Sequence, residues 1–373
     1  MRVLFLQQQP CVRALKYAAG LRTVRPDLEI AFACQGKTLG EWYRSGDELF
    51  DAWFRLGNDP RSTLPTVLHD YAPDLVHSHN LPDSLTVLAN EVGRAPVVHD
   101  VHDLQSLRRT PYENGFPEPR GRETLERRAI EESAAIVTVS NELLAAILAR
   151  YRPRGPGVVF ANYALRRDLP EHLPSREPPD GKRPRLVYEG TLSTNGGHYD
   201  LRGIFRALAA QGVSLEIFPS REAPAYRDLA AETPGVRYHD RLAPAALLRR
   251  LPEYDLGWAG FNDALNRPHL ETALPNKVFD YLASGLPVVT LDHGAIRRLL
   301  RERGVGIALR SPADLRRELA RSDLERLRER VAAVRESLTV EANIAPILAL
   351  YDDVAAVPKK RTTAVSARAS ERP

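Results

Sequence analysis

The chain has 373 residues, more than one hydrophobic core usually organises, so two domains are expected. Hydrophobic residues make up 43% and charged residues 27%, as in ordinary globular proteins, and no stretch approaches the roughly 20 apolar residues that a bilayer span needs. The net charge of +4 arises in residues 357–373, so the rest of the chain is near neutral and a general attraction for nucleic acid is not implied.

The first part of the chain alternates short apolar runs with amphipathic stretches. Such alternation predicts a parallel sheet with helices on both faces, and we expect an N-terminal Rossmann-like domain over residues 1–165. The predicted strands are residues 2–6, 29–33, 75–77, 95–98, 136–139 and 158–160, and the predicted helices are residues 13–21, 122–133 and 142–151.

A proline-rich stretch without a periodic apolar face follows at residues 166–184, and we predict a linker there. A second α/β series then occupies residues 185–339, and residues 340–356 form a last periodic segment. The basic tail, residues 357–373, is predicted to be disordered. The predicted strands of the second domain are residues 185–188, 214–218, 236–238, 255–259 and 287–290, and its helices include residues 201–210, 244–251 and 316–336.

Residues 274–289, Leu-Pro-Asn-Lys-Val-Phe-Asp-Tyr-Leu-Ala-Ser-Gly-Leu-Pro-Val-Val, are the most informative segment. Pro275 suits a helix start, and Gly285 suits its end. Lys277, Asp280 and Tyr281 are predicted to share one side of this helix. Free amide groups at a helix start attract phosphate, and a carboxylate one turn further can accept from a ribose diol. The segment therefore predicts a nucleoside diphosphate site, although an ordinary amphipathic helix has the same pattern.

This segment resembles the donor-site helix of glycosyltransferase family 4, the group 1 glycosyltransferases, in its Pro-x-Lys-aliphatic-aromatic-acid-Tyr run and Gly-x-Pro-Val-Val turn. The resemblance implies the GT-B fold: two Rossmann-like domains with parallel sheets facing a central cleft, and residues 340–356 crossing back to complete the first domain. It also implies that Asn276 and Lys277 contact the diphosphate and that Asp280 contacts the ribose. The family's first glutamate has no counterpart in register, because Thr272 stands there, so the role of Glu271 stays open.

A glycine-rich turn follows the first strand of the second domain, at residues 190–197. Such turns bring backbone amides close to phosphate, and by resemblance Gly190, Thr191 and Gly196 bind the donor. Relatives commonly carry an arginine or lysine there, which this chain lacks. Whether Arg202 replaces that cation stays open.

Histidines and acids gather at two predicted strand ends of the first domain, where ligands of such sheets collect. By resemblance, His102 lies near the donor sugar with Asp103 beside it, and with Lys277 they are the predicted catalytic residues. These residues are also ligand types that a divalent metal uses, so a metal-dependent hydrolase is one alternative. The full group is His77, His79, His99, Asp100, His102 and Asp103.

The resemblance implies a retaining, metal-independent hexosyltransferase that moves a sugar from a nucleoside diphosphate to a hydroxyl group of a glycan, lipid-linked or small-molecule acceptor. No cofactor, no metal ligand and no nucleic acid partner is predicted. Two further alternatives are a sugar-nucleotide epimerase of similar fold and a catalytically weakened nucleotide-sugar-binding protein. With two cysteines and no signal-peptide pattern, a cytoplasmic location is expected, and peripheral membrane contact stays open.

Overall fold

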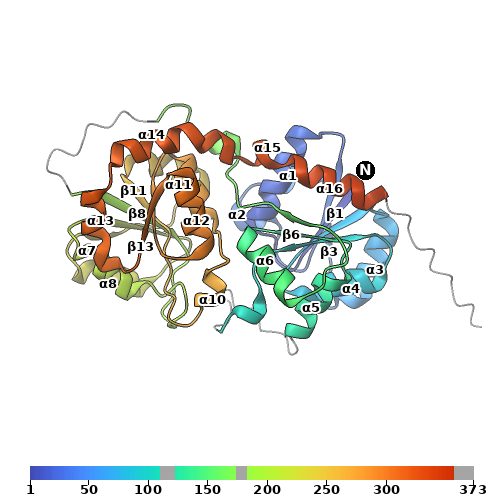
Figure 1. The fold of residues 1–373 in the computed structure, drawn as a ribbon. Helices are drawn as coiled ribbons and strands as arrows, with labels where there is room; N and C mark the ends of the chain where they lie inside the picture. Colours follow the sequence, from blue (N-terminus) through green and yellow to red (C-terminus); the bar gives the residue numbers. More distant parts are fainter. Residues whose placement is uncertain (110–121, 174–182, 357–373) are drawn as a thin grey trace, which may run out of the picture.

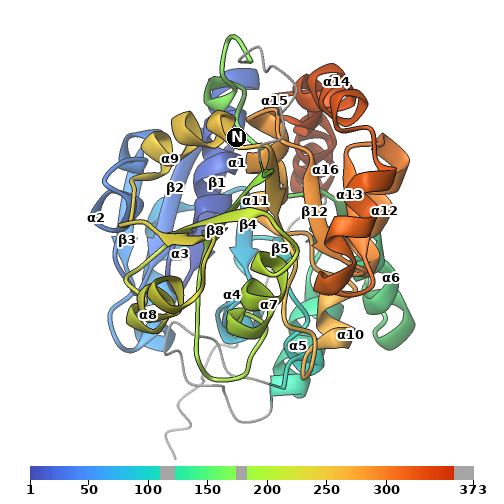
Figure 2. The ribbon, with the colours of Figure 1, turned by 90° about the vertical axis from the view of Figure 1, so that its left-hand side faces the viewer.

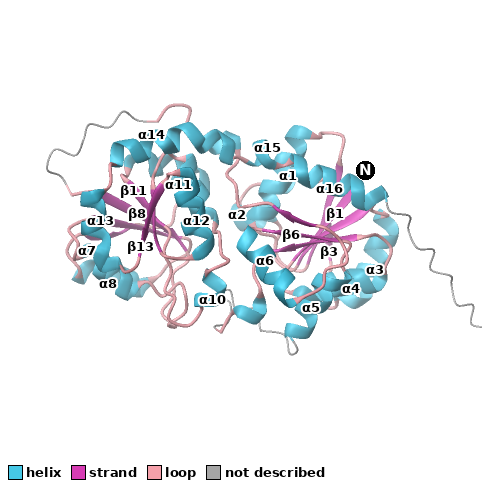
Figure 3. Ribbon diagram, viewed as in Figure 1, coloured by secondary structure: helices cyan, strands magenta, loops and turns pink. Residues whose placement is uncertain are grey.

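The computed structural model describes residues 1–109, 122–173 and 183–356. Two parallel β-sheets, each flanked by helices on both sides, form two lobes that lie side by side (Figures 1 and 3). We call the seven-stranded sheet and its helices the first lobe, and the six-stranded sheet and its helices the second lobe. The predicted α/β class, with two Rossmann-like parallel sheets, is confirmed.

The first sheet has the strand order β3-β2-β1-β4-β5-β6-β7, and all of its neighbouring strands are parallel. The order reverses between β1 and β4, where ligands of doubly wound sheets commonly bind. The strands are β1 (Arg2–Gln7), β2 (Glu29–Cys34), β3 (Ala52–Arg55), β4 (Leu75–His79), β5 (Val97–Val101), β6 (Ala135–Thr138) and β7 (Gly157–Val159).

Helices connect these strands on both faces of the sheet (Figure 1). Buried β4 and β5 carry polar residues at their carboxyl ends, where the connections begin. The helices of the first lobe are α1 (Val12–Val24), α2 (Leu39–Tyr43), α3 (Pro60–Tyr71), α4 (Asp83–Val92), α5 (Arg122–Glu132) and α6 (Asn141–Arg150), with short 3-10 turns η1 (Asp47–Leu49), η2 (Gln105–Leu107) and η3 (Arg166–Asp168).

The second sheet has the order β10-β9-β8-β11-β12-β13, and its strand order reverses between the parallel neighbours β8 and β11. In Figure 2 this lobe lies toward the viewer. Its strands are β8 (Arg185–Gly190), β9 (Ser214–Pro219), β10 (Val236–Tyr238), β11 (Leu256–Trp258), β12 (Val288–Leu291) and β13 (Gly306–Leu309). Its helices are α7 (Arg202–Ala209), α8 (Pro224–Glu232), α9 (Pro244–Arg250), α10 (Arg267–Leu270), α11 (Asn276–Ala283), α12 (Gly294–Arg303), α13 (Leu315–Arg321) and α14 (Leu324–Val334), with 3-10 turns η4 (Leu251–Glu253), η5 (Pro312–Asp314) and η6 (Arg335–Leu338).

Helix α11 packs tightly against β11 because residue 257 is a glycine. A side chain at Gly257 would overlap the ring of Tyr281. The Tyr281 hydroxyl accepts from the Glu189 amide (2.9 Å) and donates to the Trp258 carbonyl (3.1 Å). Tyr281 is thus part of the core, and the prediction that it lies with Lys277 and Asp280 on a side of the helix away from the core is wrong.

The C-terminal helices return to the first lobe across the top of the view in Figure 1. Helices α15 (Val340–Asn343) and α16 (Ala345–Ala356) place Val340, Ile347 and Tyr351 in the same hydrophobic core as β1 and α1. Gly20 permits this contact, because a Cβ there would overlap the Val340 side chain. The first lobe is therefore completed by residues from the other end of the chain.

Several elements differ from those predicted. The short strands β3 and β13 were not predicted, and the predicted helix over residues 316–336 is divided into α13 and α14, because Asp323 caps a new helix through the Arg326 amide (3.0 Å). Part of the predicted linker, residues 174–182, and the whole predicted tail, residues 357–373, lie outside the described residues. None of the described helices has both the length and the apolar character needed to cross a bilayer.

Candidate functional site

A buried ion pair lies at the carboxyl edge of the first sheet. Asp100, in β5, accepts from Arg13 Nε (2.8 Å) and Nη2 (3.0 Å), and both side chains are at most 3% exposed. Arg13 also donates to the carbonyls of Phe160 (2.7 Å) and Ala161 (3.3 Å). Burial alone would raise the pKa of Asp100, but Arg13 and the neighbouring His102, His77 and His79 together outweigh burial, and the pKa lies well below its usual range. This charged pair joins α1 to β5.

Two histidines contact each other beside Asp100. His79 Nδ1 and His102 Nε2 are 2.9 Å apart, and Asp100 Oδ2 is 3.5 Å from His79 and 3.8 Å from His102. Burial lowers the pKa of His102 to about 4 and that of His79 well below its usual value, so both rings are neutral at pH 7. His102, a predicted catalytic residue, is therefore a neutral imidazole with 15% of its side chain exposed.

The turn after β5 contacts the second lobe. Asn80 fixes this turn, because its Oδ1 accepts from the His102 amide (3.0 Å) and its Nδ2 donates to the Asp103 carbonyl (2.7 Å). Asp103 Oδ1 lies 3.7 Å from His269 Nε2 of the second lobe. The predicted pair His102 and Asp103 therefore faces the second lobe.

Lys277, in the first turn of α11, points into the protein. Its side chain is 8% exposed, and Nζ has no hydrogen-bond partner among the described residues. Nζ lies 4.1 Å from the ring centre of Tyr188 and 5.3 Å from that of Phe261. A Cβ at Gly190 would be 3.2 Å from Nζ, so the glycine leaves room beside the amine. The structure thus brings the predicted residues Gly190 and Lys277 together.

A second buried acid, Glu189, accompanies Lys277 and was not predicted. Its Oε1 has no hydrogen-bond partner in the described part of the chain. Burial raises the pKa of Glu189 to about 8, and burial lowers the pKa of Lys277 to about 7. Burial therefore drives both groups toward their neutral forms. The only sequence signal was an acid at the end of an apolar strand.

Lys16 of α1 reaches across to α11. Its Nζ donates to Asn276 Oδ1 (2.9 Å) and lies 3.5 Å from Asp280 Oδ1. Burial raises the pKa of Asp280, and Lys16 opposes that rise. Asn276 and Asp280, both predicted to bind the donor, thus share one cation from the first lobe. Arg13 and Lys16 stand three residues apart in the first half of α1, which holds no other charged residue, and this was an available sequence signal for a buried polar face.

The loop after β8 uses part of its hydrogen-bonding capacity internally. Thr191 Oγ1 is 3.3 Å from Ser220 Oγ, and the Gly196 amide donates to Asp200 Oδ2 (3.1 Å). Arg202 donates to both oxygens of Asp200 (2.9 and 2.7 Å) and to the Thr194 carbonyl (3.2 Å). Arg202 therefore stabilises the part of the loop around Thr194 and Asp200, while Gly190 and Thr191 lie at the end near Lys277.

Glu271 also has a structural partner. Its Oε2 accepts from the Gly294 amide at 2.8 Å, at the start of α12. The neighbouring Thr272 carbonyl accepts from Ser140 Oγ of the first lobe (2.7 Å), while Ser140 also caps α6 through the Leu143 amide (3.0 Å). This contact is one of several that join the lobes beside the candidate site.

A group of buried rings lies between Lys277 and the turn after β5. The rings of His198 and His269 are 5.6 Å apart, and Phe261 lies 5.9 Å from His198. Burial, together with the charges of Arg108, His269 and Lys277, lowers the pKa of His198 to about 2. Phe261 thus connects this group of rings to the Lys277 amine, which lies 5.3 Å from its ring centre. Sequence analysis did not assign His198 and His269 to the site, because these residues converge only in the folded chain.

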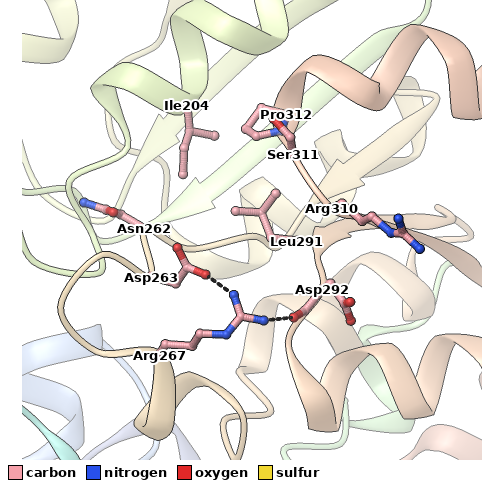
Figure 4. A pocket seen from close by; sticks show the side chains of 9 residues that line it. All are labelled: Ile204, Asn262, Asp263, Arg267, Leu291, Asp292, Arg310, Ser311 and Pro312. Atoms are coloured by element: carbon pink, nitrogen blue, oxygen red, sulfur yellow. Dashed lines mark hydrogen bonds and ion pairs between the residues drawn. The ribbon is translucent and has the colours of Figure 1, made fainter.

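A separate cavity of about 370 Å³ lies at the carboxyl ends of β11, β12 and β13 (Figure 4). Within it, Arg267 donates to Asp263 Oδ2 (2.7 Å) and to the Asp292 carbonyl (3.4 Å). Its lining contains none of the predicted site residues. The lining is Ile204, Asn262, Asp263, Arg267, Leu291, Asp292, Arg310, Ser311 and Pro312.

Comparison with known families matches each lobe to a glycosyltransferase domain. The Glycosyl transferase 4-like domain matches residues 7–163, and the Glucosyltransferase 3-like, C-terminal domain matches residues 205–342. No curated protein sequence matches the chain significantly.

Solved structures share the fold over nearly the whole chain. A glycosyltransferase from Rickettsia africae is 12% identical with a TM-score of 0.70, and the match covers 96% of this chain and 99% of that one. HepE from Anabaena, solved with UDP-glucose, is 14% identical with a TM-score of 0.67 over 94% and 100% of the two chains. A candidate UDP-N-acetylglucosamine 2-epimerase from Listeria monocytogenes is 14% identical with a TM-score of 0.58 over 94% and 97%. The chain therefore has the GT-B fold of the group 1 glycosyltransferases, with one family domain matched in each lobe.

Proposed function

We propose that this protein transfers a sugar from a nucleoside diphosphate to a hydroxyl group of an acceptor. The supporting observation is the buried Lys277 amine, which has no hydrogen-bond partner among the described residues and lies beside Gly190. A buried amine without a partner is costly, and an anionic ligand would remove that cost. Helix α11 also has no side-chain cap at its N-terminus, so its first amides can bind the same anion.

In this proposal the diphosphate lies between Lys277 and the Gly190–Thr191 end of the loop. Asp280 accepts from the ribose hydroxyls, and Lys16, 3.5 Å away, opposes the rise in the pKa of Asp280 that burial causes. The backbone N–H of Asn276, at the start of α11, contributes to phosphate binding. Positive charge held in a buried site stabilises the leaving diphosphate more strongly than water would, because the groups are already oriented. In this scheme the transfer needs no metal ion.

The reaction breaks the bond between the sugar C1 and the diphosphate oxygen and forms a bond between C1 and the acceptor oxygen on the same face. The acceptor proton passes to the leaving phosphate oxygen, so the products are a nucleoside diphosphate and a glycoside of retained configuration. Neutral His102, with Asp103 beside it, would hydrogen-bond a sugar hydroxyl and orient C1.

The first test is a thermal-shift screen with UDP, GDP and dTDP and with their sugar conjugates. Stabilisation by one base series, followed by NMR of products formed with glycan, lipid-linked and small-molecule acceptors, would support the proposal and report the anomeric configuration. Failure of every nucleoside diphosphate to bind at millimolar concentration would contradict it.

A second candidate function is epimerisation of a nucleotide sugar. It is favoured by the buried acid Glu189 beside the Lys277 amine, because epimerases need acid and base groups at the donor. The same NMR experiment without acceptor distinguishes the two, since an epimerase changes the donor sugar by itself. Binding without turnover in either assay would instead indicate a nucleotide-sugar-binding protein.

A further inference from the structure

Three potential metal ligands converge at the carboxyl edge of the first sheet. Cys11 lies in the loop after β1, His79 ends β4, and His102 follows β5, and these three strands are neighbours in the sheet. One ligand atom from each of these residues lies within 4.8 Å of the other two. Cys11 is half-buried and His102 is partly exposed, so solvent can reach the group.

We propose that Cys11, His79 and His102 form a binding site for a thiophilic divalent cation such as Zn²⁺. Thiolate and imidazole are the ligands that Zn²⁺ prefers, and three protein ligands with a fourth open position is a common arrangement. Tetrahedral Zn²⁺ places such ligand atoms roughly 3.3–3.6 Å apart, given its usual bond lengths. The two ring nitrogens are 2.9 Å apart and the sulfur lies within 4.8 Å, so small side-chain shifts suffice.

The protonation of the two rings suits a metal. A nitrogen-to-nitrogen contact of 2.9 Å requires that one of the two atoms carries no proton. His79 Nε2 is buried and has no hydrogen-bond partner among the described residues. His79 Nε2 therefore has no hydrogen bond in either tautomer. Moving the proton to Nε2 leaves the lone pair of Nδ1 free for a metal and breaks no hydrogen bond at Nε2.

The surrounding charges also permit a cation. Asp100 Oδ2 lies 3.5 Å from His79 and 3.8 Å from His102, which offsets part of the added positive charge. Arg13 is paired with both oxygens of Asp100 and reduces this compensation, so most of the negative charge must come from the ligands themselves. The Cys11 thiolate supplies the remaining negative charge. A second group of potential ligands, His77, His79 and Asp100, is a poorer site because it is fully buried. His77 is already hydrogen-bonded to Tyr351, and Asp100 is already paired with Arg13.

A cation bound here would occupy His102, which the proposed function assigns to the donor sugar. Only this consequence rests on the proposed function: metal binding would inhibit transfer, and the metal-free protein would be the active form. The binding itself needs neither nucleotide nor acceptor, so it can be tested separately.

The test is titration of the metal-free, reduced full-length protein with Co²⁺, which reports thiolate coordination through a charge-transfer absorption band. We expect one equivalent of Co²⁺ to produce the band and Zn²⁺ to displace it. Cys34→Ser is the matched control, because Cys34 is the other cysteine of the chain and its Sγ contacts the Gly36 carbonyl instead. The band should persist in Cys34→Ser and disappear in Cys11→Ser.

Cys11→Ser should fold, because Cys11 is the N-cap residue of α1, makes no side-chain cap bond, and serine is favoured at that position. His102→Asn is a second variant, and loss of a ligand should weaken Co²⁺ binding by at least about tenfold. Absence of the thiolate band in the wild type, or an equal band in Cys11→Ser, would overturn the site. Either result would leave nucleotide binding at Lys277 unaffected, so failure of this inference is distinguishable from failure of the proposed function.

Discussion

The two lobes each contain a buried cationic side chain beside a carboxyl group, but the two pairs differ in how many hydrogen bonds they make. In the first lobe, Arg13 bonds to both oxygens of Asp100 and to two backbone carbonyls. In the second lobe, Lys277 Nζ and Glu189 Oε1 have no hydrogen-bond partner within the described residues. Buried polar groups are normally satisfied, so the first pair is explained by the fold, whereas the second is explained best by a ligand.

Removing one member of the satisfied pair should have the largest effect on stability. Asp100→Ala leaves the Arg13 guanidinium buried without its carboxylate, and we expect the free energy of unfolding to fall by about 3–5 kcal/mol. Chemical denaturation measures this change. Asp352→Ala is the control, because Asp352 pairs with Arg25 at the surface (3.0 Å) and should cost at most about 1 kcal/mol. Equal effects of the two substitutions would show that burial of the Asp100 pair does not matter.

Removing the unsatisfied amine should change binding rather than folding. Lys277→Met retains the apolar stem of the side chain, so we expect the free energy of unfolding to be unchanged or higher. The affinity for the preferred nucleoside diphosphate should fall more than tenfold, which corresponds to about 1.4 kcal/mol or more. Calorimetric titration measures the affinity, and Lys37→Met, which alters an exposed lysine over Trp42, is the control. An unchanged dissociation constant in Lys277→Met would remove the phosphate role.

The same amine should make nucleotide binding depend on pH. Burial lowers the pKa of Lys277 to about 7, so the amine loses its charge as pH rises through 7, and diphosphate binding must restore that proton. Affinity should therefore fall above pH 7, by up to about tenfold per pH unit. Ionisation of Glu189, with a pKa of about 8, acts in the same direction by repelling phosphate. Titrations between pH 7 and 8.5 test this, and the slope should be smaller in Lys277→Met.

Glu271 provides the smallest expected effect. Because its carboxylate accepts from the Gly294 amide at the start of α12, Glu271→Gln should lower the free energy of unfolding by about 0.3–1 kcal/mol. Donor affinity should stay within about twofold of the wild type, which we would measure with the nucleotide sugar found in the screen. A large loss of affinity with unchanged stability would assign Glu271 to the sugar instead.

Much of the fold was predictable because strand alternation and helix periodicity are local properties. Helix α11 was also predictable, since Lys277 and Asp280 stand one turn apart in a recognisable segment. Lys16 and Glu189 were not, because each reaches the site only when α1 or β8 is placed against α11. Tyr281 shows the same limit: its position in the helix fitted the site, but the space above Gly257 places it in the core.

The hydrophobic core of the first lobe combines residues 3–165 with residues 340–354, and this affects how the protein folds during synthesis. Tyr351 and Val354 of α16 are buried against β1, β4 and α1, yet they leave the ribosome after both sheets have been synthesised. Domains commonly fold as they emerge, so the second lobe can complete its packing first. The first sheet, although translated earlier, keeps an open apolar face until residues 340–356 have been synthesised, and a nascent chain stopped before residue 340 would expose that face to chaperones.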